Sequence, residues 1–156
     1  MRHVLRSQEE VLQVPSVCEK YFALLDMMCE AFAERVYLAP AAVQEQIAAS
    51  LNMGLRSSGG AVARCSLSVL QHLAAQHLAK RSNAGFGEVV KHYLTFVFDW
   101  FVLQSFDMDL LELAAESLFT LLCCDMSHFQ HLAKQLIEAQ VRRGGGVASS
   151  GRNGSG

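Results

Sequence analysis

Apolar residues recur at helical spacing along almost the whole chain, and the strict alternation typical of strands is nearly absent. Turn signals interrupt this pattern at short intervals. They occur at Pro15, Pro40, Ser57–Gly60, Ser82–Gly87, Asp107 and Asp125–Ser127. The sequence therefore predicts an all-α chain in which helices of ordinary length are joined by short connections.

The expected helices follow from these breaks. They run from Ser16 through Phe32, from Pro40 to about Leu55, from Val62 to Leu78, from Glu88 to Leu103, from Leu110 to about Cys123, and from Ser127 to Val141. Gly54 is expected to mark a frayed helix end, and Asp107 or Asp109 is expected to cap the helix that follows. The helix over 88–103 is so apolar that we expect it to be buried on most sides, in the middle of the assembly.

The breaks at Pro15, Gly60 and Asp107 are about 45 residues apart, and each interval holds two helices. That period is typical of HEAT repeats, in which each hairpin packs only on its neighbours. We therefore expect a HEAT-like α-α superhelix, or solenoid, of about three antiparallel helical hairpins. Periodicity alone leaves open an ordinary helical bundle without a true repeat.

Three regions are expected. Residues 1–14 would form a partial helix of a preceding repeat, and residues 15–142 would hold the HEAT-like repeats. Residues 143–156 are rich in glycine and serine and lack large apolar side chains, so we expect a disordered tail. An RNA-binding tail at Arg142–Gly144 is a weaker reading, because no repeated arginine–glycine pattern follows.

The charge and cysteine content narrow the possible partners and compartments. The net charge is −2, which gives no field to attract nucleic acid or an anionic membrane. The five cysteines lie in apolar helical contexts, as expected for free thiols in a reducing compartment. No secretory signal is visible, and the longest apolar stretch, Tyr93–Leu103, is too short to span a bilayer. We expect a soluble intracellular protein.

No residue pattern predicts catalysis, a cofactor or a metal. The pair Cys123 and Cys124 lies near His128 and His131, but adjacent positions on a helix point about 100° apart and do not converge on zinc. A metal-dependent enzyme built on this cluster is the weakest hypothesis. The acidic residues near position 107 are better explained as helix caps. Aromatic and methionine side chains at helical spacing are expected in the core: Phe22, Met27, Met28, Phe96, Phe98 and Phe129.

Several segments bear a family resemblance. Lys91–Gln104 (KHYLTFVFDWFVLQ) and Ala114–Cys123 (AAESLFTLLC) resemble the C-terminal region of the exportin-4 family of nuclear transport receptors, in the importin-β superfamily. Val14–Phe22 (VPSVCEKYF) and Ser50–Leu55 (SLNMGL) extend the likeness over most of residues 14–140. These are packing motifs, and their specificity lies in their order and spacing.

The resemblance implies a HEAT-repeat karyopherin that shuttles between nucleus and cytoplasm through the nuclear pore complex, where it meets nuclear pore proteins. Such a receptor carries protein cargo together with Ran-GTP, the family cargoes being translation factor eIF-5A and Smad-type factors. The chain matches only the far C-terminal part of such a receptor, and it departs from the family where the glycine-rich tail begins. A stand-alone helical-repeat scaffold or adaptor is the rival hypothesis.

A polar strip on the helix over 88–103 is the candidate contact surface. It consists of Glu88, His92, Thr95 and Asp99. In this family the second helix of each hairpin lines the concave side, which implies that the strip faces protein partners there. The alternative is a strip that is merely solvated. The end repeats are expected to expose apolar faces that further chain would cover.

Overall fold

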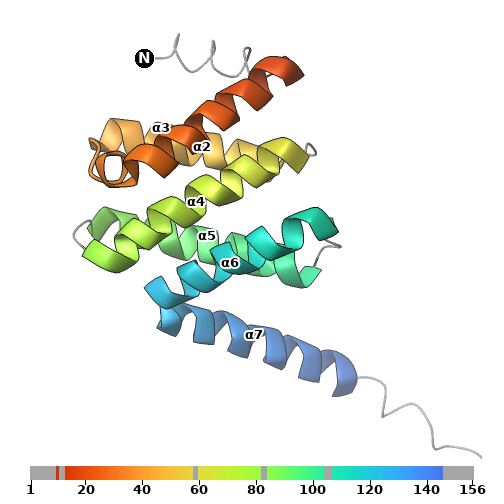
Figure 1. Cartoon of the computed structure of the whole chain (residues 1–156). Coiled ribbons are helices and arrows are strands. Elements are labelled where there is room, and N and C mark those ends of the chain that lie inside the picture. Colours follow the sequence, from red (N-terminus) through yellow and green to blue (C-terminus); the bar gives the residue numbers. More distant parts are fainter. Residues whose placement is uncertain (1–9, 11–12, 58–59, 82–83, 104–106, 146–156) are drawn as a thin grey trace, which may run out of the picture.

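The computed structural model describes residues 10, 13–57, 60–81, 84–103 and 107–145. Within these ranges the chain forms six helices and no strand (Figure 1). They are α2 (Pro15–Tyr37), α3 (Ala41–Leu55), α4 (Gly60–Lys80), α5 (Ala84–Leu103), α6 (Met108–Cys124) and α7 (Met126–Gly145). The predicted all-α class is confirmed.

Local signals explain the helix ends. Pro15 occupies the first turn of α2, where its missing N–H costs no hydrogen bond. Pro40 lies just before α3, and the amide of Gln44 donates to the carbonyl oxygens of Val36 and Tyr37 at 2.7 Å each. These bonds satisfy acceptors that the end of α2 leaves open. Asp107 caps α6, because its Oδ1 accepts the N–H of Asp109 at 3.3 Å.

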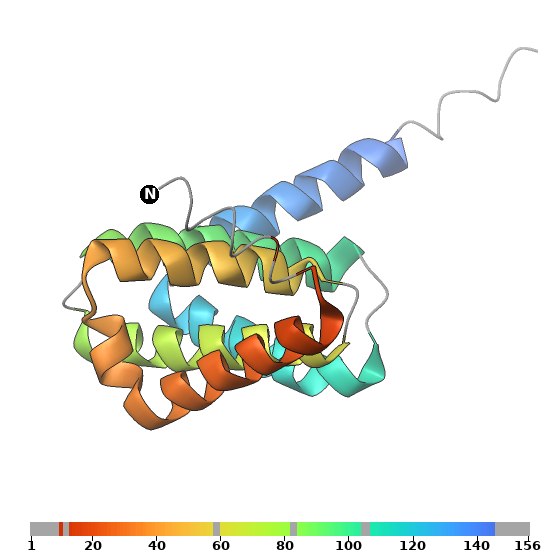
Figure 2. The same ribbon diagram turned by 90° about the horizontal axis from the view of Figure 1, so that it is seen from above.

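The helices pair into three hairpins, α2–α3, α4–α5 and α6–α7, which follow one another as the rungs of a stack (Figure 1). Seen from above, the first helices α2, α4 and α6 form one layer, and α3 and α5 form a second (Figure 2). α2 packs on α4, and α4 packs on α6. This serial order is the HEAT-like solenoid arrangement predicted from the spacing of the breaks.

Hydrogen bonds between rungs repeat the period of the sequence. Arg64 of α4 donates to the carbonyl oxygen of Asp109 in α6, 45 positions along the chain. The Tyr93 hydroxyl of α5 donates to the carbonyl oxygen of Ala48 in α3, also 45 positions away. First helices thus bond to first helices and second helices to second helices, as translational repeats require.

One apolar core runs through all three rungs. Its largest fully buried side chains come from α2, α3, α4, α5 and α6: Tyr37, Tyr93, Phe22, Leu51, Leu67, Leu70, Leu73, Leu94 and Leu121. On α5, the central second helix, Val90, Leu94 and Val97 are buried. The expected burial of this helix is confirmed for that side, whereas Val102 and Leu103 near its end are 43% and 74% exposed.

Gly54 does not mark a frayed end, and that prediction was wrong. It is buried in α3, and a Cβ built on it would lie 2.0 Å from Ser66 Oγ and 2.5 Å from Phe22 Cε1. Any larger side chain at this position of α3 would collide with Phe22 of α2 and Ser66 of α4, so only glycine fits between the three helices.

The expectation that the methionines of α2 belong to the core was also wrong. Phe22 is fully buried, but Met27 and Met28 are 66% and 47% exposed, because they lie on the side of α2 that faces away from α4. At the other end of the stack, Ile137 and Val141 of α7 are 63% and 68% exposed. Exposed apolar side chains therefore lie on both the first and the last hairpin; that further chain would cover them stays a prediction.

Only small parts of the two outer regions lie within the described residues. The predicted partial helix over 1–14 lies mostly outside the described residues, as does the tail from residue 146 onward. α7 continues to Gly145, so it includes the first residues of the segment expected to be a disordered tail. Similarly, α5 starts at Ala84 inside the expected break over 82–87.

A ring cluster joins the first two hairpins. Tyr37 Oη lies 2.9 Å from His77 Nδ1, and Phe86 packs with its ring centroid 5.3 Å from each of the two rings. Burial, and secondarily the positive charge of Arg81, lower the pKa of His77 below its ordinary value of 6.5. The folded chain therefore favours the neutral imidazole.

This arrangement predicts a pH-dependent contribution to stability. Because the folded-state pKa is lowered, the contribution of His77 is complete above pH 6.5 and is lost as the pH falls below that value. We expect His77→Gln, which keeps an acceptor for Tyr37, to reduce the fall in the free energy of unfolding between pH 7.5 and pH 5.5. Urea unfolding of both proteins at both pH values measures the difference. An identical pH dependence would contradict the assignment.

Candidate protein-binding surface

The predicted strip lies along one side of α5 and opens onto a groove. Glu88, His92, Thr95 and Asp99 line a shallow depression of about 510 Å³ together with three further residues, Lys91, Phe96 and His128. Glu88, His92 and Asp99 are exposed, and Thr95 is half-buried. We call these seven residues the α5 groove. All four residues of the predicted strip therefore lie together.

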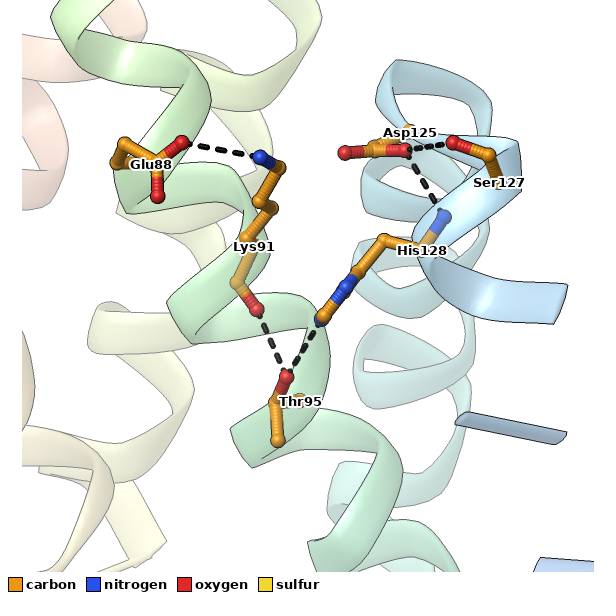
Figure 3. A network of polar contacts seen from close by, with 6 residues as sticks. All are labelled: Glu88, Lys91, Thr95, Asp125, Ser127 and His128. Carbon is orange, nitrogen blue, oxygen red and sulfur yellow. Dashed lines mark hydrogen bonds and ion pairs between the residues drawn. The ribbon is translucent and has the colours of Figure 1, made fainter. Parts of the chain in front are cut away.

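The α7 side of the α5 groove is held by a polar network (Figure 3). Thr95 Oγ1 donates to the carbonyl oxygen of Lys91 at 2.9 Å and lies 2.8 Å from His128 Nε2. Since a threonine hydroxyl has a single proton, His128 Nε2 acts as the donor in the second bond. This bond connects α5 to α7 and fixes one wall of the groove.

Asp125, which lies between α6 and α7, positions His128. Its Oδ1 accepts the backbone N–H of His128 and the hydroxyl of Ser127, both at 3.0 Å, and so caps the start of α7 (Figure 3). Although desolvation opposes it, the hydrogen bonds from His128 and Ser127 leave the pKa of Asp125 below its ordinary value. The sequence indicated only a break at this position, so the cap is a further finding.

On the side of the α5 groove that faces α3, two side-chain contacts connect α3 and its C-terminal end with α5. His92 Nε2 lies 3.2 Å from Asn52 Oδ1, and the Arg56 guanidinium stacks 5.9 Å from the centroid of the Phe96 ring. Near the start of α5, Lys91 Nζ donates to Glu88 Oε1 at 2.9 Å. The side chain of Asp99 is exposed, and none of the described residues forms a hydrogen bond or ion pair with its carboxylate. The groove thus presents imidazole, ammonium, carboxylate and aromatic groups on a fixed framework.

The sequence missed three members of the α5 groove. Lys91 lies three positions after Glu88 and four before Thr95, so helical spacing could have included it. Phe96 follows Thr95 directly, and it was assigned to the core with the other aromatic residues. His128 belongs to α7, and only the packing of α7 on α5 brings it there.

The cysteine–histidine cluster near the end of α6 does not converge. Cys124 Sγ donates to the carbonyl oxygen of Ala74 at 3.3 Å, whereas His128 faces Thr95 and His131 is exposed. Burial raises the pKa of the Cys124 thiol to about 11, which disfavours the thiolate that zinc requires. Within the described ranges no group of three histidine, cysteine or acidic side chains could hold a metal ion.

Two further predictions concern the cysteines and the apolar stretches. All five cysteines lie in described helices, and each is a free thiol. None of the helices in the described part of the chain has the length and hydropathy of a membrane span. The arrangement on α5 is suited to hydrogen bonding and charge pairing with another macromolecule. Its assignment to a concave protein-binding side stays a prediction.

No protein-family model matches the chain, and no solved structure gives a significant match.

Proposed function

We propose that this chain is a segment of a nuclear export receptor of the exportin-4 type, which binds protein cargo together with Ran-GTP. Two observations support the proposal. The segments Lys91–Gln104 and Ala114–Cys123 resemble that family, and residues 91–103 lie in α5 and residues 114–123 in α6. The serial packing of hairpins is the architecture that such receptors use.

The α5 groove is the proposed contact surface. It combines opposite charges with an exposed carboxylate at Asp99, and its walls are fixed by hydrogen bonds to α3 and α7. A preorganised polar surface loses little conformational entropy on binding. We assign it to the protein cargo, with translation factor eIF-5A or a Smad-type factor as the family candidates. Nuclear pore proteins would bind elsewhere on the receptor as it shuttles between nucleus and cytoplasm.

The mechanism we propose is a shared preference for one curvature. Each hairpin contacts its neighbours through helix faces, so small rotations between rungs add up to a change in the bend of the stack. If Ran-GTP and cargo favour the same bend, each raises the affinity for the other by the same factor. This coupling would load cargo in the nucleus and release it after GTP hydrolysis.

Binding measurements test this function. We expect the chain to bind eIF-5A more tightly in the presence of Ran-GTP than in the presence of Ran-GDP, as measured by titration calorimetry with purified proteins. Binding of neither Ran-GTP nor cargo would contradict the proposal and favour the rival, a helical-repeat scaffold or adaptor unrelated to nuclear transport. Equal affinity with both nucleotide forms would contradict the coupling.

A double substitution in the α5 groove tests whether this surface binds the cargo. The double substitution His92→Ala and Asp99→Ala should weaken cargo binding about tenfold, or about 1.4 kcal/mol, because it removes a hydrogen-bonding imidazole and an exposed carboxylate. Glu30→Ala, at an exposed position of α2 in the other layer, is the matched control and should leave the affinity unchanged. Unchanged affinity in the groove variant would remove the groove from the binding surface.

A further inference from the structure

The α5 groove contains hydrogen-bond acceptors that no described residue uses. Asn52 Oδ1 can only accept a hydrogen bond, so its contact with His92 Nε2 at 3.2 Å makes this nitrogen the donor. The neutral imidazole of His92 then has Nδ1 as an acceptor. The Asp99 carboxylate lies two helical turns further along α5, and within the described part of the chain it accepts no hydrogen bond. This side of the groove therefore offers acceptors to a ligand.

The cations at the α5 groove are already engaged. Lys91 Nζ donates to Glu88 Oε1 at 2.9 Å (Figure 3). This hydrogen bond, the charge of Glu88 and, more weakly, the charge of Asp125 raise the pKa of Lys91 above its ordinary value. Arg56 lies at the edge of the groove, with its guanidinium over the Phe96 ring. Among the described residues, Asp99 is thus the carboxylate of the groove that lacks a cation.

We propose that the α5 groove binds an arginine side chain of its protein partner, with the guanidinium paired to the Asp99 carboxylate. This inference rests on the proposed function in one respect, the assignment of the groove to a protein partner, and it names the side chain that the partner supplies. A guanidinium carries five N–H donors in one plane and can pair with a carboxylate through two parallel hydrogen bonds. It therefore supplies the donors and the positive charge that the acceptors at Asp99 and His92 lack.

The wall beside Asp99 suits an arginine side chain. Phe96 is half-buried and lies one helical turn before Asp99 on α5, so its ring offers apolar surface to the methylene stem of the ligand. Arg56 is an example within the chain, since its guanidinium lies 5.9 Å from the centroid of the same ring. Lysine would supply a compact, strongly hydrated ammonium that neither stacks on a ring nor pairs with both carboxylate oxygens in a fixed plane.

NMR titration of the whole chain with single-residue probes tests the proposal. Nα-acetyl-arginine amide should shift the backbone amide signals of Glu88, His92, Thr95 and Asp99 saturably, with a dissociation constant on the order of 1 mM. Nα-acetyl-citrulline amide has nearly the same shape without the charge, so it should bind about tenfold more weakly. Nα-acetyl-lysine amide should also bind more weakly than the arginine probe. Equal binding of the citrulline or the lysine probe would overturn the choice of a guanidinium.

A pair of substitutions locates the binding site. Asp99→Asn keeps the shape of the side chain and removes its charge, so it should weaken binding of the arginine probe about tenfold. Glu30→Gln removes a charge at an exposed position of α2 and is the matched control that should leave the affinity unchanged. Circular dichroism verifies that both variants are folded. Unchanged affinity in Asp99→Asn, or signal shifts confined to residues outside the α5 groove, would overturn the proposal.

The probe titration uses neither Ran-GTP nor cargo, so its failure is separate from a failure of the proposed function. A chain that binds eIF-5A with Ran-GTP but does not bind the arginine probe would overturn this inference alone. A chain that binds the arginine probe at the α5 groove, but neither Ran-GTP nor eIF-5A, would support the arginine site and contradict the receptor function.

Discussion

Gly54→Ala is expected to lower the free energy of unfolding by about 2 kcal/mol, which corresponds to a fall in Tm of roughly 6 °C. The added Cβ would lie 2.0 Å from Ser66 Oγ and 2.5 Å from Phe22 Cε1, distances at which atoms must move. Phe22 and Ser66 are both fully buried, so neither can move without disturbing the core. Overpacking of this kind lowers the free energy of unfolding by about 3 kcal/mol, and the higher helix propensity of alanine offsets about 1 kcal/mol of that loss.

A matched glycine gives the control for this substitution. Gly87 lies in α5, and a Cβ added there would have no neighbouring atom within 4 Å, so Gly87→Ala should stabilise the chain by about 0.5 to 1 kcal/mol. Adding Ser66→Ala to Gly54→Ala should recover part of the loss, because Ser66 Oγ is the nearest obstacle. Equal effects of alanine at the two glycines, measured by urea unfolding, would contradict the close approach of α2, α3 and α4.

Leu121→Ala is expected to have the largest effect, a loss of about 2 to 5 kcal/mol in the free energy of unfolding. Leu121 is 0% exposed, and it lies one helical turn after Ser117, whose hydroxyl donates to the carbonyl oxygen of Leu67 in α4. Truncation removes its apolar contacts and leaves a cavity between the second and third rungs.

Phe119 gives the matched control on the same helix. It is 67% exposed and lies two positions before Leu121, on the outer side of α6. Phe119→Ala should change the free energy of unfolding by no more than about 0.5 kcal/mol, because it removes little buried surface. The comparison is made by urea unfolding of the two variants and the unmodified chain. A larger loss for Phe119→Ala than for Leu121→Ala would show that the two sides of α6 are assigned the wrong way round.

The sequence allowed the helices and their pairing to be predicted, because helical periodicity and the spacing of proline, glycine and aspartate are local signals. It could not give the packing partners of single residues. Met28 and Leu25 follow the same helical stripe, yet one is 47% and the other 8% exposed, since burial depends on which side of α2 receives α4. The sequence does not distinguish a glycine at a frayed helix end from a glycine at a close contact between helices. Only the neighbouring side chains show that Gly54 lies at such a contact.

The candidate site, too, could be predicted only in part from the sequence. The strip of Glu88, His92, Thr95 and Asp99 is visible in the sequence as the polar side of an apolar helix. The hydrogen bond between His128 and Thr95 joins residues 33 positions apart, and this separation in sequence is set by the length of α6 and its connection to α7. A single sequence contains no local signal for such a pair. The function proposed for this surface depends on its exposure and fixed geometry, which the structure provides.

Hydrogen exchange resolved helix by helix in the Leu121→Ala chain tests the serial stack most directly. In a stack where each rung packs only on its neighbours, weakening the contact between α4 and α6 should speed exchange most in α6 and α7 and least in α2 and α3. Faster exchange by the same factor in all six helices would contradict the serial arrangement, because it would show a closed globule that opens as one unit.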